Sequence, residues 1–80
     1  MLDYSDIDNY FTVKEIIRDF LGRDRKLMSI ASTLDRCINV SYRIRKHRKP
    51  VKKLVLGKGF RRAYTYRDIP WIIDFLQESM

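Results

Sequence analysis

Hydrophobic residues recur at helical spacing through the first half of the chain, and the first such stretch predicts a helix over residues 12–21. The apolar face of this helix consists of Val13, Ile16, Ile17, Phe20 and Leu21. Thr12 and Glu15 are spaced as a capping box, in which the side chain of each accepts a hydrogen bond from the backbone amide of the other. Gly22 follows, and glycine readily adopts the left-handed conformation that ends many helices.

A second apolar stripe follows and predicts a helix that begins at Asp24 or Arg25. Its members recur at helical intervals, and they are Leu27, Ile30, Ala31, Leu34 and Ile38. Cys37 lies next to this stripe, so we expect it to be a small residue of the core.

The helical pattern becomes ambiguous beyond this stripe. Asn39 and Ser41 favour local side-chain hydrogen bonds, which compete with those of a helix. We therefore expect a break near these two residues and a separate third helix over residues 41–48, ended by Pro50. One uninterrupted helix over residues 25–48 is the alternative that the pattern leaves open.

The spacing of the hydrophobic residues changes again after Pro50. Residues 51–56 and 60–66 are rich in Val, Leu, Phe, Tyr and Thr, which is typical of strands. Between them lie Gly57 and Gly59 on either side of Lys58, and the two glycines allow the positive backbone dihedrals of a tight turn. The pattern predicts a β-hairpin.

A last helix follows, which we expect Asp68 to cap, with Pro70 in its first turn, where a missing amide is harmless. The inward-facing residues of all these elements should share one core. Its expected members are Ile16, Phe20, Ile30, Leu34, Leu54, Ile72 and Leu76. The order of the elements predicts one small domain of the α+β class.

Charge is strongly segregated along the chain. From Arg36 to Arg67 there are twelve Lys and Arg residues and no Asp or Glu, which leaves five basic against ten acidic residues elsewhere. A surface with interspersed positive and negative charges would keep the protein soluble with less self-repulsion. The segregation therefore indicates a surface for a polyanion, and nucleic acid is the commonest one.

Two segments resemble a known family. The sequence YFTVKEI at residues 10–16 is similar to the opening of excisionase-like and MerR-related winged-helix domains, and residues 56–69 are similar to their wing. The resemblance implies a small winged helix-turn-helix over residues 11–80, with three helices, a basic hairpin wing and a C-terminal helix. Residues 1–10 would precede it as an acidic arm. In this fold the third helix enters the major groove and the hairpin contacts the backbone or the minor groove.

The expected function is sequence-specific binding of double-stranded DNA, as a transcriptional regulator or a recombination accessory factor. The third helix would read base edges or phosphates, while the hairpin would hold the backbone. The expected contact residues are Ser41, Tyr42, Arg43, Arg45, Lys46, His47, Arg48, Lys49, Lys52, Lys53, Lys58, Arg61 and Arg62.

Catalysis, cofactors and metals are not expected. Cys37 and His47 are the only residues of their types, too few for a structural zinc site, and Asp3, Asp6 and Asp8 are spaced too irregularly for a metal site. The sequence contains neither a phosphate-binding loop nor a nucleophile with its partners, so we expect no enzyme and no small-molecule substrate. The lone cysteine and the short apolar runs indicate a cytoplasmic protein, associated with the nucleoid and without a membrane partner.

Two alternative functions use the same charges. A module for RNA or single strands would stack bases on Tyr64 and Tyr66, although half-buried core positions are the plainer interpretation of both tyrosines. A protein-interaction factor would place its basic face on an acidic partner. Association with a second copy or a partner protein also stays open.

Overall fold

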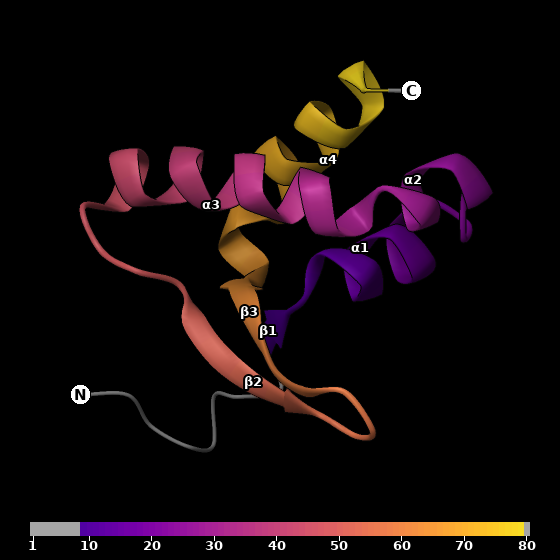
Figure 1. Cartoon of the computed structure of the whole chain (residues 1–80). Coiled ribbons are helices and arrows are strands. Elements are labelled where there is room, and N and C mark those ends of the chain that lie inside the picture. The colour runs from indigo at the N-terminus through magenta and orange to yellow at the C-terminus, as the bar shows by residue number, and fades with distance from the viewer. Residues whose placement is uncertain (1–8, 80) are drawn as a thin grey trace.

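The computed structural model describes residues 9–79, which form four helices, a short 3-10 helix and a three-stranded antiparallel sheet (Figure 1). This confirms the α+β class. The elements in chain order are β1 (Tyr10–Phe11), α1 (Val13–Phe20), α2 (Arg25–Ser29), α3 (Ala31–Lys46), β2 (Val51–Val55), β3 (Gly59–Thr65), the 3-10 helix η2 (Tyr66–Asp68) and α4 (Ile69–Glu78).

Helix α1 begins and ends as predicted. The Thr12 hydroxyl accepts a hydrogen bond from the Glu15 amide at 3.2 Å, and the Glu15 carboxylate accepts one from the Thr12 amide at 3.0 Å, which completes the capping box. After α1, Gly22 and Arg23 are both left-handed, with φ of 66° and 60°. Asp24 then caps α2, because its carboxylate accepts a hydrogen bond from the amide of the third residue after it. A tight turn therefore joins α1 to α2.

The break in the central helical region lies at Ile30, so the prediction of a separate helix over residues 41–48 is wrong. Ile30 has φ −110° and ψ 17°, between α2 and α3, and α3 continues unbroken to Lys46. Its buried face extends through the expected break to Tyr42, and packing of this face outweighs the local preferences of Asn39 and Ser41. His47 ends the helix in a left-handed conformation with φ 54°.

The predicted hairpin is present, and β1 adds a third strand that the sequence did not indicate. Strands β2 and β3 pair from Val51 opposite Ala63 to Val55 opposite Gly59. Strand β1 pairs with the other edge of β3, so the strand order is β1-β3-β2. Tyr10 thus belongs to the sheet and not to an irregular arm, Asn9 before it is exposed, and residues 1–8 of the expected arm lie outside the described residues.

Asp68 occupies the N-cap position of α4 without making a capping hydrogen bond. Its buried carboxylate instead accepts hydrogen bonds from the Thr65 hydroxyl and from Trp71 Nε1, both at 3.0 Å. Pro70 lies in the first turn of α4, as predicted. Asp68 therefore joins the end of the sheet to α4, which is a different role from the one expected.

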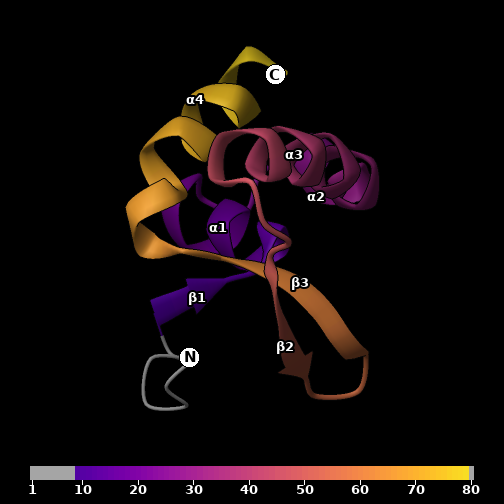
Figure 2. The same cartoon turned by 90° about the vertical axis from the view of Figure 1, so that its left-hand side faces the viewer.

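The core lies between the four helices and the base of the sheet (Figure 2). Four of the seven expected members are buried, namely Ile16, Leu34, Ile72 and Leu76. Phe20, Ile30 and Leu54 are 49%, 38% and 64% exposed, and Cys37 is also exposed, so these four assignments to the core are wrong. Phe20 packs against the ring of Phe11 at 6.1 Å, whereas Leu54 lies on the part of the hairpin that projects away from the helices (Figures 1 and 2).

Candidate nucleic-acid interface

An open groove of about 650 Å³ lies between α1, the start of α3 and the turn of the hairpin. Its basic lining residues are Lys14, Arg18, Lys58, Arg61 and Arg62. They belong to α1 and to the hairpin, which are far apart in the sequence. The fold therefore assembles a cationic groove from segments that no single stretch of sequence contains.

Both acidic residues that line this groove are already paired. The Glu15 carboxylate accepts hydrogen bonds from Lys53 Nζ at 3.2 Å, and Asp35 Oδ2 lies 2.7 Å from a guanidinium nitrogen of Arg62. Among residues 9–79, no ion pair engages Lys14, Lys58 or Arg61. Lys14, Lys58 and Arg61 are thus left for an external anion, whereas Arg18 and Arg62 are paired with Asp19 and Asp35.

Two of these free lysines lie next to each other. The pKa of Lys14 is lowered from the ordinary lysine value, first by its interaction with the like-charged Lys58 and then by desolvation and the charge of Arg61. Like charges held this close repel each other. An anion placed between them would relieve that repulsion, as a DNA phosphate would do.

Three of the predicted contact residues, Lys46, Lys53 and Arg62, are instead used inside the molecule. Lys53 donates to the Tyr10 carbonyl oxygen at 3.0 Å as well as to Glu15, Arg62 pairs with Asp35 on α3, and Lys46 lies 3.3 Å from Asp68. Lys53 and Arg62 join the hairpin to the helices. Their charges therefore position the hairpin, and fewer of the predicted residues are free to bind phosphate.

Tyr42 is buried, which makes it wrong as a contact residue. Its ring packs edge-to-face against Tyr64 at 5.2 Å, and the Tyr64 hydroxyl donates to Asp35 Oδ1 at 3.0 Å. Burial, followed by the charge and hydrogen bond of Asp35, raises the pKa of Tyr64 well above the ordinary tyrosine value. Neither ring is free to stack on a base. Tyr66, by contrast, is exposed.

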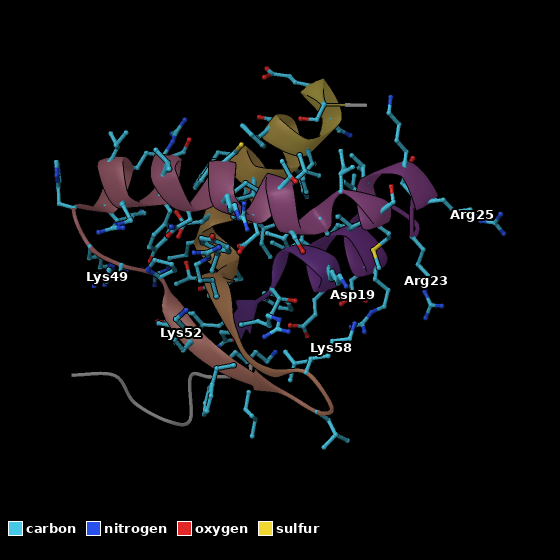
Figure 3. The ribbon with its side chains drawn as sticks, viewed as in Figure 1. Asp19, Arg23, Arg25, Lys49, Lys52 and Lys58 are labelled. Atoms are coloured by element: carbon cyan, nitrogen blue, oxygen red, sulfur yellow. The ribbon has the colours of Figure 1, made fainter. Side chains whose placement is uncertain are left out.

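The remaining predicted residues lie outside the lining of the groove. They are Ser41, Arg43, Arg45, His47, Arg48, Lys49 and Lys52, on the last turns of α3, in the connection to β2 and at the start of β2. Ser41 is half-buried, and the Arg45 guanidinium lies 4.6 Å from the centre of the Trp71 ring. Figure 3 shows Lys49 and Lys52 on the side opposite Lys58. The predicted residues therefore extend from the end of α3 along the hairpin, where Lys52 lies opposite Arg62, to Lys58 and Arg61 in the groove.

Five basic residues in the first part of the chain were not predicted as contact residues, and two of them, Lys14 and Arg18, line the groove. They lie on α1, on the turn that follows it and on α2, and they are Lys14, Arg18, Arg23, Arg25 and Lys26. Arg23 and Arg25 extend into solvent on the same side as Lys58 (Figure 3). The excess of acidic residues over residues 1–35 obscured them. Their place opposite the apolar face of α1 was the signal that could have found Lys14 and Arg18.

Within residues 9–79, no three His, Cys, Asp or Glu side chains gather as a metal site requires, and no helix has the length and apolarity to cross a membrane. Asp3, Asp6 and Asp8 lie outside the described part of the chain. Comparisons of this chain with protein-family models, with curated proteins and with solved structures found no match.

Proposed function

We propose that this protein is a small winged helix-turn-helix factor that binds double-stranded DNA. The pair of α1 and α2–α3, joined by a tight turn and followed by a basic hairpin, supports this layout. The observation that carries the proposal is the groove between them. Its acidic residues are consumed by internal ion pairs, while Lys14, Lys58 and Arg61 have no ion-pair partner among the described residues.

In this proposal α2 and the first turns of α3 read the bases, in place of residues 41–48. This end of the helical region adjoins the groove, and Ser32 lines the groove itself. Its exposed polar side chains are Arg25, Lys26, Ser29, Ser32 and Thr33. Arginine and lysine read guanine edges, and hydroxyls contact bases or phosphates. The hairpin holds the backbone beside them through Lys58 and Arg61, which carry affinity without sequence information.

The burial of Tyr42 and Tyr64 favours duplex DNA over a single strand. Proteins that bind single strands commonly stack successive bases on exposed aromatic rings, and here Tyr64, which was expected to stack bases, lies in the core with Tyr42. We propose action by occupying DNA, as a regulator of transcription or an accessory factor in recombination. No catalytic step is part of this proposal.

The test is a titration of labelled random-sequence duplex with the protein at several salt concentrations. If five to eight phosphates are contacted, log K should fall with log salt at a slope of about −4 to −7. Competition with single strands of equal length should favour the duplex. A slope near zero, or preference for the single strand, would contradict the proposal.

A further inference from the structure

The end of the hairpin carries apolar side chains that nothing in the described structure covers. Leu54 and Phe60 are cross-strand partners and are each 64% exposed. Leu56, in the turn, is 98% exposed. We define these three residues as the apolar tip. Because cross-strand partners point to the same face of a sheet, Leu54 and Phe60 form one continuous apolar surface beside Leu56.

The turn that presents Leu56 is well defined. The Lys58 amide donates to the Val55 carbonyl oxygen at 2.9 Å, which closes a β-turn with Leu56 as its second residue. Gly57, the third residue, has φ 79°, the left-handed conformation that a type II turn requires at that position. Leu56 therefore projects from a hydrogen-bonded turn at the outermost end of the hairpin.

The hairpin end carries two kinds of chemistry side by side. Lys58, Arg61 and Arg62 line the cationic groove, whereas the apolar tip is not part of that lining. The whole segment from residue 36 to residue 67 contains no acidic residue. An occupant of this region must therefore offer an apolar slot directly beside dense negative charge.

Duplex DNA offers both features, because its stacked bases lie between two rows of phosphates. We propose that the apolar tip inserts between base pairs from the minor groove and bends the DNA that the cationic groove holds. Apolar wedges of this kind partly unstack a base step and kink the duplex towards the major groove. This inference rests on the proposed function, and it adds DNA bending to DNA binding.

The experiment uses a duplex of about 30 base pairs with a donor and an acceptor dye at its two ends and flexible TA steps at its centre. Energy transfer reports bending, and anisotropy of the same duplex reports binding. We expect the parent protein to raise energy transfer. We expect Leu56→Ser to abolish that rise while it weakens binding by roughly tenfold or less, because the phosphate contacts remain.

Ile44→Ser is the matched control. Ile44 is 67% exposed on α3, away from the hairpin, so its replacement removes a similar apolar side chain from another surface. This variant should bend and bind DNA like the parent. Both variants should melt like the parent by circular dichroism, since neither side chain belongs to the core.

The outcomes separate the two proposals. If the parent binds the duplex without a rise in energy transfer, or if Leu56→Ser still bends it, the wedge is overturned and the proposed function stands. If the parent binds no duplex, both are overturned. If Leu56→Ser instead loses binding to vesicles of anionic phospholipid that the parent binds, with no bending of DNA by the parent, the apolar tip is a membrane contact and the wedge is wrong.

Discussion

The helical body and the hairpin use their apolar residues in opposite ways. Leu34 of α3 and Leu54 of β2 were both expected in the core, yet Leu34 is 5% exposed and Leu54 is 64% exposed. The helices bury one face against each other, whereas the outer half of the hairpin has no element against which to bury one (Figure 2). The body thus gains its stability from apolar packing, and the hairpin end does not.

The base of the hairpin is held by the buried side chains of Ala63 and Tyr64 and, in addition, by polar contacts. Two ion pairs join it to the helices, Lys53 to Glu15 and Arg62 to Asp35, and strand β1 pairs along its inner edge. Partly exposed ion pairs contribute little stability but fix geometry. The comparison teaches that the outer hairpin is free to present both charge and apolar surface to a partner.

The largest expected effect is on stability. Leu34→Ala leaves a cavity in a close-packed core and should lower the free energy of unfolding by about 2–5 kcal/mol. For a domain of this size that corresponds to a fall in Tm of about 10 °C or more. Leu54→Ala should change the free energy by less than about 0.5 kcal/mol, because the side chain is mostly in solvent. Thermal unfolding followed by circular dichroism measures both changes. Equal losses of stability in the two variants would contradict the difference between the helical body and the hairpin.

The next effect concerns DNA affinity. It compares the basic residues of the groove with those on the last turns of α3 and in the connection to β2. The double variant Lys14→Glu with Lys58→Glu should weaken duplex binding by about 100-fold at low salt, because it replaces two phosphate contacts with repulsion. The double variant Arg43→Glu with Lys49→Glu makes the same change in net charge. We expect it to weaken binding by less than about tenfold, through long-range attraction alone.

Anisotropy titrations at matched salt give both affinities. A greater loss of affinity for the Arg43 and Lys49 double variant would mean that DNA binds near the end of α3 and not in the groove. All four residues are exposed, so the two double variants should unfold at nearly the same temperature as the parent.

The smallest effect tests the attachment of the hairpin. Lys53→Met removes the ammonium group that binds Glu15 and the Tyr10 carbonyl, and it should destabilise the protein by about 1 kcal/mol. Lys52→Met is the matched control, since the neighbouring lysine is exposed and has no ion-pair partner among the described residues. Urea unfolding should show a lower midpoint for the first variant only. Identical midpoints would mean that the ion pair contributes nothing to the attachment.

Much of the fold could be predicted because its signals are local. The capping box at Thr12, the left-handed Gly22 and the glycine-flanked hairpin turn depend on residues a few positions apart, and all three are present. The error at residues 39–41 has a physical reason. Ile38 and Tyr42 are both buried by tertiary contacts, and this packing outweighs the local preferences of Asn39 and Ser41.

The candidate site was less predictable, because its residues meet only in three dimensions. The segregated charge indicated the hairpin, and Lys58 and Arg61 do line the groove. Lys14, however, reaches the groove from α1, and no sequence spacing relates it to Lys58. The sequence also does not show which basic residues form ion pairs. Lys52 and Lys53 are neighbours of the same type, but only Lys53 binds Glu15. Alternation along a strand also leaves open whether anything covers its apolar face, so the pattern alone does not show that Leu54 is exposed.

The short strand β1 has a consequence for the order in which the molecule folds. Tyr10 pairs with Thr65, so this contact closes a long loop that contains every helix except α4 and the 3-10 helix, whereas the hairpin and each helix form between near neighbours. Contacts that close long loops carry a larger entropic barrier and tend to form late. We therefore expect the helices and the hairpin to form first, and the pairing of β1 to complete the native arrangement. The rate of that last step, measured by stopped-flow refolding, would then depend on residues 10 and 11 more than on the hairpin turn.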